Sequence, residues 1–323
     1  MIKKTLIIAA FLICGITNLF AQDPEFTQFY ANPLYLNPAF AGSVRCPRLV
    51  MNYRHEWPSI GGTYLTTSAS YDQYVNSLHG GIGVLVMNDR AGEGTLTTNN
   101  ASLIYSYHLA VSRTFSIIAG FQGTFTQKKL DFSKLTFGDM IDPKYGFYYT
   151  TKETTPDNAS SSIYPDFSAG LLAYSNRFYG GLVVNHLAEP NESFYSNQIS
   201  PLPRKITAHL GMSIPLDRES SISPNILFQQ QQDFRQINLG MYMNKGPLVF
   251  GLWVRGSNRN ADSFIALVGL QQGLIRFGYS YDITVYKLAL VSGGHVHGNR
   301  GGRISYGDCA FQGQRCCDHT NPG

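Results

Sequence analysis

The stretch ASLIYSYHLAVSRTFSIIAGFQGTFT, residues 101–126, alternates apolar side chains with small or polar ones. The side chains of a β-strand point in turn to the two faces of a sheet, so a period of two predicts strands. Ser112 and Arg113 interrupt the pattern, which indicates two long strands joined by a tight turn. One face of this hairpin holds mainly Leu, Tyr, Phe and Ile, whereas the other holds mainly Ser, Thr, Gly and Gln.

Segments of this kind recur fourteen times along the chain. Most contain nine or more residues, enough for a tilted strand to cross a bilayer, whereas strands of soluble proteins average about five or six. An even number also agrees with single-chain bacterial barrels. The segments lie near 47–56, 63–74, 79–88, 95–110, 113–128, 164–175, 178–187, 204–214, 220–230, 234–243, 247–256, 262–271, 274–284 and 301–311.

The connections between these segments alternate in length. Short turns follow the even-numbered segments, whereas long loops follow segments five, seven and thirteen, at 129–163, 188–203 and 285–300. Outer-membrane barrels have short periplasmic turns and long external loops. A soluble β-sandwich also alternates apolar and polar residues, but it gives no reason for this odd–even rule. The sequence therefore predicts an all-β transmembrane barrel of about 14 antiparallel strands over residues 47–311, with both chain ends in the periplasm.

The N-terminal residues indicate the compartment. Lys3 and Lys4 precede an apolar run from Thr5 to Phe20, and Ala21 supplies a small residue before the expected cleavage point. We therefore expect residues 1–21 to be a signal peptide that is removed. Beyond it, no apolar run approaches the roughly twenty residues of a transmembrane helix.

Composition agrees with a barrel and argues against a nucleic-acid-binding function. Charged residues make up 14% of the chain, well below the roughly 25% of soluble domains. Without the signal peptide, 23 Lys and Arg face 21 Asp and Glu, a balance that argues against nucleic acid as a partner.

The segment 22–46, which begins QDPEFTQFYANPLYLNPAFAG, is apolar yet broken by prolines at 24, 33 and 38. Proline cannot donate to a sheet ladder, so this segment is not expected to form a strand. Irregular apolar backbone at membrane depth must be enclosed by protein. We therefore expect the segment to start on the periplasmic side and to form a plug, either in the barrel lumen or beneath its periplasmic mouth.

Motifs that would indicate an enzyme are absent from the sequence, including nucleophile elbows, phosphate loops and zinc-protease motifs. His108 lies beside Ser106 on the polar face of its strand, but a lone lumenal histidine is more often simply hydrogen-bonded than catalytic. Asp139 and Asp142 have too few oxygen-bearing neighbours to predict a calcium site. We therefore predict no enzymatic activity, no cofactor and no metal.

Four cysteines follow the signal peptide, and their state stays open. Cys46 precedes the first strand and Cys309 ends the last, so closing the barrel would bring them near each other for a possible disulfide. Cys316 and Cys317 lie with His319 in the tail 312–323. Adjacent cysteines suit a tetrahedral metal site poorly, and free thiols are the remaining alternative.

Five motifs point to a known family. The run NPLYLNPAFAG at 32–42 is followed by LTFGDMID at 135–142, PDFSAG at 165–170, YGGLVVNH at 179–186 and LPRK at 202–205. In this order the motifs resemble the PorP/SprF family of Bacteroidetes outer-membrane proteins over residues 22–285. The family motif in the N-terminal segment comprises Asn32, Pro33, Leu34, Leu36, Asn37, Pro38, Phe40 and Gly42.

The resemblance implies a function in the type IX secretion system and gliding motility. Members assist secreted surface adhesins, whose C-terminal signal domain they help export or hold at the cell surface. Expected partners are such an adhesin, other type IX components and outer-membrane lipid. The alternatives are a core PorP-like component that links the outer membrane to periplasmic partners, a passive porin, and a barrel enzyme acting on lipid.

The long loops are the expected partner-binding surface, because dense exposed aromatic residues usually mark a protein interface or a lid over the barrel mouth. Both interpretations stay open. The candidate residues are Phe132, Leu135, Phe137, Asp139, Ile141, Asp142, Tyr145, Phe147, Tyr148 and Tyr149 in the loop 129–163, with Phe194, Tyr195 and Tyr286 in the neighbouring loops.

Overall fold

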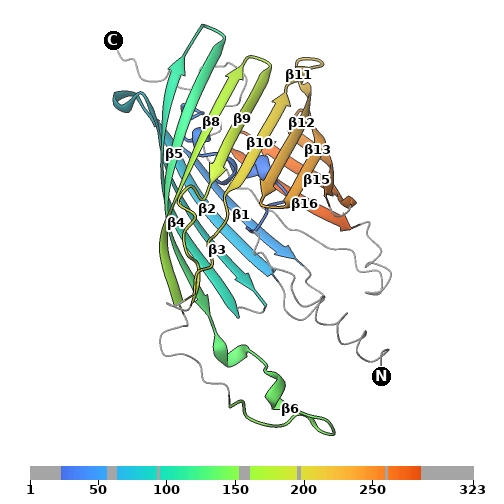
Figure 1. Ribbon diagram of the computed structural model, residues 1–323. Coiled ribbons are helices and arrows are strands. Elements are labelled where there is room, and N and C mark those ends of the chain that lie inside the picture. Colours follow the sequence, from blue (N-terminus) through green and yellow to red (C-terminus); the bar gives the residue numbers. More distant parts are fainter. Residues whose placement is uncertain are drawn as a thin grey trace, which may run out of the picture.

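A computed structural model describes residues 23–56, 64–92, 95–152, 161–194, 198–258 and 261–284. In these ranges one antiparallel sheet curves around a central space (Figure 1). Each strand pairs with the next in chain order, and short β11 (Ile214–Pro215) pairs with β12 beside β10. The long strands are β1 (Arg48–Glu56), β2 (Tyr64–Val75), β3 (Gly80–Ala91), β4 (Leu96–Ala110), β5 (Phe115–Leu130), β8 (Ser161–Ser175), β9 (Phe178–Asn185), β10 (Lys205–Met212), β12 (Ser220–Gln231), β13 (Phe234–Lys245), β14 (Leu248–Ser257), β15 (Ala261–Gln272) and β16 (Ile275–Thr284).

The predicted strand order is confirmed along this sheet. Thirteen of the fourteen predicted segments correspond to the long strands, with ends that differ by a few residues. The fourteenth, 301–311, lies outside the described residues, as do the predicted signal peptide and the tail 312–323.

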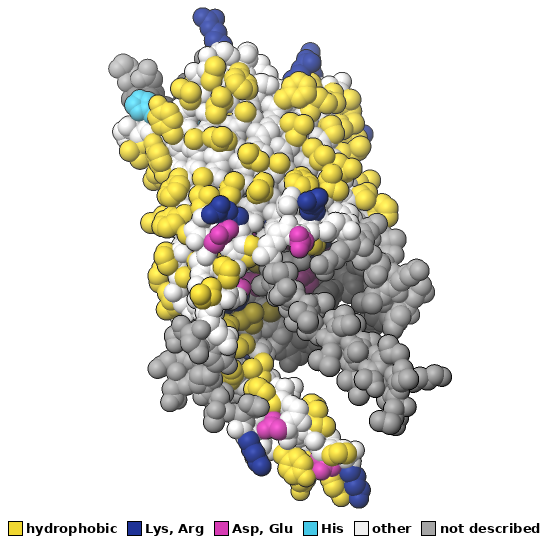
Figure 2. All heavy atoms as spheres, in the orientation of Figure 1, with side chains coloured by type: hydrophobic (Ala, Val, Ile, Leu, Met, Phe, Trp, Pro, Cys, Tyr) yellow, Lys and Arg dark blue, Asp and Glu magenta, His cyan; other side chains and the backbone are white. Residues whose placement is uncertain are grey.

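The two faces of the sheet are inverted relative to a soluble protein. On β4, Leu103 is 71% exposed on the outer face, whereas Ser102 and Ser106 are buried on the inner face. Hydrophobic side chains gather in a broad band over the outer surface, with Lys and Arg beyond one edge of it (Figure 2). An apolar exterior around a polar interior is the arrangement of a transmembrane barrel. The protein is therefore an outer-membrane β-barrel.

In the described residues, no helix is long and apolar enough to cross a membrane. The helices present are short. They include η3 (Asn76–Leu78) in the turn between β2 and β3. Another three, η1 (Phe29–Ala31), α2 (Pro33–Leu36) and η2 (Pro38–Phe40), lie in residues 23–46, which we name the lumenal segment.

The lumenal segment lies inside the curved sheet (Figure 1). Leu34 and Ala39 are completely buried there, and Phe29 and Phe40 are almost so. Proline begins both α2 and η2, where the missing N–H would have no helical partner in any case. The prolines that prevent a strand thus start short helical turns instead.

The lumenal segment runs along the barrel from one end to the other. Its first residue, Asp23, contacts His186 just after β9, at the end of the barrel that bears the long loops. Its later residue Gly42 contacts Asp72 near the opposite end, where the short turns lie. We name these the long-loop end and the short-turn end. The expectation that the segment starts on the short-turn side is wrong, because its position before β1 determines only where it finishes.

A hairpin extends from the long-loop end. Strands β6 (Ile141–Asp142) and β7 (Gly146–Phe147) pair in it, after the short helices η4 (Phe132–Lys134) and η5 (Gly138–Met140). Figure 1 shows it projecting well beyond the barrel strands. We name residues 137–149 the aromatic hairpin.

Candidate functional site

Two Asn-Pro pairs fix the lumenal segment to the barrel wall. The Asn37 side chain accepts a hydrogen bond from the Ala39 nitrogen at 2.9 Å and donates one to the Leu171 carbonyl at 3.1 Å. Asn32 donates to the Ser68 hydroxyl at 3.0 Å. Buried amides of this kind stabilise a fold only when they find partners. Both polar atoms of the Asn37 amide have partners, whereas in Asn32 only the nitrogen has one among the described residues, so Asn37 specifies the docked position more strictly.

Glycines of the wall allow the backbone of the segment to come unusually close. A β-carbon on Gly120 would lie 2.3 Å from the Ala39 nitrogen, and one on Gly81 would lie 2.2 Å from the Ala41 oxygen. No real β-carbon tolerates such distances, and the obstructing atoms belong to the backbone. The wall therefore requires glycine where the motif packs, a requirement that the sequence analysis missed.

An ion pair locks the segment where it joins β1. The Arg48 Nε lies 2.8 Å from Asp72 Oδ1, and both side chains are buried. Arg48 also donates to the Phe40 carbonyl at 3.0 Å, and the Gly42 nitrogen donates to Asp72 at 2.8 Å. A buried ion pair contributes only when its remaining hydrogen-bonding groups are satisfied, as they are here.

Aromatic rings occupy part of the space between the segment and the far wall. Phe29 packs edge-on against Trp253 of β14, with ring centroids 5.1 Å apart. Phe40 stacks on His209 of β10 at 5.5 Å. Such pairs contribute roughly 0.5–1.5 kcal/mol beyond their buried area. Together with the contacts to β2, β5 and β8, they hold the segment on both sides of the lumen.

A charged cluster anchors Asp23 at the long-loop end. His186 Nε2 lies 2.8 Å from Asp23, and His186 Nδ1 lies 2.7 Å from Asp166. Burial alone would lower the pKa of His186, but the charges of Asp23 and Asp166 and their hydrogen bonds outweigh it and raise the pKa to about 10. Burial alone would raise the pKa of Asp23, yet His186 and Lys205 bring it well below 3.8.

These shifts predict how the anchor depends on pH. The contribution of His186 is fully present below its ordinary pKa of 6.5 and is lost as the pH rises through about 10. The contribution of Asp23 is present above 3.8 and is lost as the pH falls. We expect the melting temperature in detergent to fall by several degrees more between pH 7 and 11 for the native chain than for His186→Gln. Equal decreases in both chains would contradict the anchor.

The residues of the predicted partner surface divide into two groups. Tyr145, Phe147 and Tyr148 are 64%, 67% and 69% exposed, and Ile141 and Tyr149 are exposed as well. The remaining described aromatic and Leu positions, Phe132, Leu135, Phe137 and Phe194, are only half-buried. Tyr195 and Tyr286 lie outside the described residues.

The two loop aspartates organise their own hairpin. Backbone N–H groups of Lys144 and Tyr145 donate to Asp142, which lowers the pKa of its carboxyl. Asp139 accepts bonds from Thr151 and from the Lys152 nitrogen. Within the described ranges, no cluster of three or more His, Cys, Asp or Glu is arranged to hold a metal.

Two other residues singled out in the sequence lie near the lumenal segment. His108 Nε2 lies 3.0 Å from the Ser106 hydroxyl and 3.1 Å from the Ala41 carbonyl, so its neighbours are a wall strand and the segment itself. Cys46 is buried, and Cys309 lies outside the described residues, so their disulfide stays a prediction.

Comparison with protein families settles the relationship that the motifs suggested. The profile described as "Type IX secretion system membrane protein PorP/SprF" matches residues 18–297. The chain belongs to the PorP/SprF family. This PorP/SprF protein is accordingly a membrane protein of the type IX secretion system, located in the outer membrane. No curated protein matches its sequence.

Solved barrels show weak similarity to this PorP/SprF chain. A "CymD monoaromatic hydrocarbon channel" has 12% identity and a TM-score of 0.49, covering 86% of this chain and 92% of that one. A "KdgM porin in complex with disordered oligogalacturonate" has 9% identity and a TM-score of 0.36, with 80% and 98% covered. A Rhodopseudomonas blastica porin mutant has 6% identity and a TM-score of 0.34, with 81% and 99% covered. The fold assignment rests instead on strand order and on the distribution of side chains.

Proposed function

We propose that this PorP/SprF protein is a non-enzymatic barrel dedicated to a secreted surface adhesin. It binds the C-terminal signal domain of the adhesin at the long-loop end and helps to export it or to anchor it at the cell surface, as gliding motility requires. Family membership supports a function in type IX secretion. The position of the aromatic hairpin supports the long-loop end as the place where the signal domain binds.

The exposure of this hairpin is the observation that carries the proposal. Its tip displays Tyr145, Phe147 and Tyr148 to solvent, and the rings of Tyr145 and Tyr148 pack at a tilt with their centroids 5.6 Å apart. Aromatic residues are enriched where interfaces are strongest, because they bury a large area with little loss of side-chain entropy. A projecting hairpin also presents these rings away from the bilayer, where a folded signal domain can reach them.

The segment that crosses the lumen argues against a passive porin. A porin requires a water-filled channel from end to end. Here the lumenal segment contacts strands on all sides of the lumen, from Ser68 of β2 through Leu171 of β8 to Asp282 of β16. A barrel occupied in this way is better suited to holding a partner than to passing solutes.

The test replaces Tyr145, Phe147 and Tyr148 together by alanine. Truncating a single aromatic anchor typically costs about 2 kcal/mol or more, roughly thirtyfold in affinity. We expect the triple variant to assemble normally and to lose most of the surface-retained adhesin, measured by immunolabelling of intact cells. The affinity of the purified barrel for the isolated signal domain should fall at least about thirtyfold.

The matched control replaces Thr136 and Thr150, exposed polar residues on the same loop, by alanine. It should retain the adhesin fully. Full retention by the aromatic triple variant would place the binding surface elsewhere on the protein. Loss of barrel assembly can be recognised separately, because a folded barrel migrates differently on gels before and after heating.

A further inference from the structure

A cavity lies at the short-turn end, opposite the aromatic hairpin. It has a volume of about 740 Å³ and lies between the lumenal segment and strands β9 to β16. Turn residues line its opening, including Arg177 between β8 and β9 and Arg218 between β10 and β12. This volume falls within the range of about 300–1,000 Å³ typical of ligand sites.

The lining combines cations with aromatic rings. Four arginines line the cavity, namely Arg48, Arg177, Arg218 and Arg276, against one acidic residue, Glu219. Arg48 is neutralised by Asp72. The remaining charges leave an excess of positive charge around the opening.

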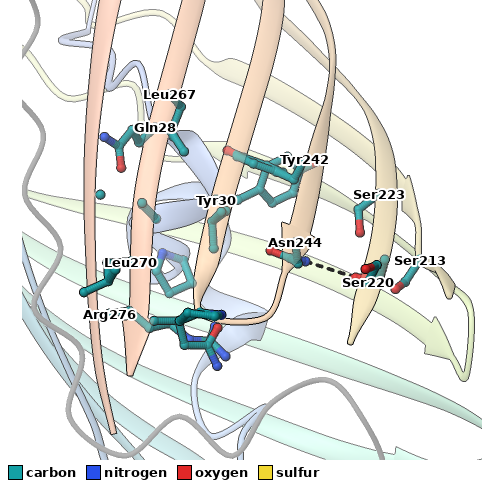
Figure 3. Close-up of a pocket in the computed structure, with 18 of the residues that line it drawn as sticks. Gln28, Tyr30, Ser213, Ser220, Ser223, Tyr242, Asn244, Leu267, Leu270 and Arg276 are labelled. Carbon is teal, nitrogen blue, oxygen red and sulfur yellow. Dashed lines mark hydrogen bonds between the residues drawn. The ribbon is translucent and has the colours of Figure 1, made fainter. Parts of the chain in front are cut away.

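Tyrosine and serine side chains also line the cavity. Figure 3 shows Arg276 on one side, Ser213, Ser220 and Ser223 on the other, and Tyr30 and Tyr242 between them. The hydroxyl of Tyr30 is buried and has no hydrogen-bond partner among the described residues. A buried polar group without a partner is costly, so this hydroxyl indicates a place for a ligand atom.

We propose that this cavity binds a short acidic peptide segment of a partner protein that approaches from the short-turn end. Carboxylates match the arginines at the opening, which donate charge-assisted hydrogen bonds. Apolar or aromatic side chains of the same segment match Tyr30, Tyr242 and Phe40.

A peptide fits these observations better than a small anion. The cavity is large enough for several side chains, and its positive and aromatic groups are spread over separate strands and turns rather than focused on one point. A protein of a secretion system also functions among other proteins. The cavity lies at the other end of the barrel from the surface proposed for the adhesin, so this inference does not rest on that function.

The test measures peptide binding to the full-length protein in detergent by fluorescence anisotropy. The probe is a labelled hexapeptide of alternating Glu and Tyr, compared with hexapeptides in which Gln or Lys replaces each Glu. We expect the acidic peptide to bind at least about tenfold more tightly than either, because charge-assisted hydrogen bonds are the stronger class. Its affinity should fall as salt is added.

Variants locate the site. Arg218→Glu should weaken binding of the acidic peptide at least about tenfold. Arg113→Glu, a matched charge reversal in another exposed short turn outside the cavity, should change it little. Ser223→Trp should abolish binding by filling the cavity while leaving the charge unchanged.

Three results would overturn the proposal. Equal losses from Arg218→Glu and Arg113→Glu would show only general attraction to a basic surface. Unchanged binding in Ser223→Trp would place the peptide outside the cavity. Trigalacturonate, a short acidic sugar, serves as a further probe. If it binds and the acidic peptide does not, the cavity is a site for an acidic sugar.

Discussion

A chain that lacks residues 22–42 is expected to conduct ions steadily across a planar bilayer, whereas the intact chain should stay almost silent. The deletion removes Asn32, Leu34 and Asn37, all completely buried in the lumen. The wall that remains is largely polar on its inner face, with Ser68, Ser102 and Ser106 among its buried residues. Water would fill such a space, and the loss of packed contacts should also lower the melting temperature.

A point substitution tests the same feature without shortening the chain. Valine at Gly120 would collide with the backbone of Ala39, which no side-chain rotation can relieve. Overpacking typically costs about 1–3 kcal/mol, and a collision with backbone should lie at the upper end. Gly120→Val should therefore displace the lumenal segment and raise conductance.

Gly123→Val is the matched control on the same strand. A β-carbon there meets only the ring of Phe167 at 3.8 Å, on the outer face. It should leave stability and conductance unchanged. Silent recordings from a correctly assembled deletion variant would show that something other than residues 22–42 closes the barrel.

An epitope inserted between Gln22 and Asp23 is expected to be labelled on intact cells, which is unusual for the N-terminus of a barrel whose first strand begins at the short-turn end. Asp23 lies against His186 and Lys205, at the end that bears the long loops. Outer-membrane barrels expose their long loops to the outside. Labelling of intact cells should be nearly all-or-none, because antibodies do not cross the outer membrane.

Two further insertions serve as the positive and the negative control for this experiment. An epitope after Lys144, in the aromatic hairpin, should be labelled on intact cells. One after Gly246, in the turn between β13 and β14, should be labelled only after permeabilisation. If the N-terminal epitope behaves like the one at Gly246, the segment enters the lumen from the short-turn end in the cell.

The strands could be predicted because their signal is local. Neighbouring residues such as Ser102 and Leu103 lie on opposite faces, and this alternation persists in almost every strand. This pattern can be read within one segment, without knowing which strand pairs with it. The connections could be predicted for the same reason, since turn and loop lengths follow directly from the gaps between segments.

The interior could be predicted only in part. Prolines and aromatic residues showed that residues 22–46 must be enclosed, but not in which direction they run. That direction depends on pairs such as Asp23 and His186, which are 163 residues apart in sequence. Gly120 does not stand out among 32 glycines until the backbone of Ala39 is seen against it. Long-range contacts of this kind leave no periodic trace in a single sequence.

The path of the lumenal segment has a consequence for how the barrel is assembled. Thr27 bonds to Asp282 of β16, 255 residues later in the chain, yet the segment itself is synthesised first. A flexible chain loses more entropy when distant residues are brought together, although this loss grows only slowly with length. Because the segment contacts early and late strands alike, it can act as a template around which successive hairpins fold. The curvature of the finished cylinder would then be set by a piece of chain that was already present before the first strand formed.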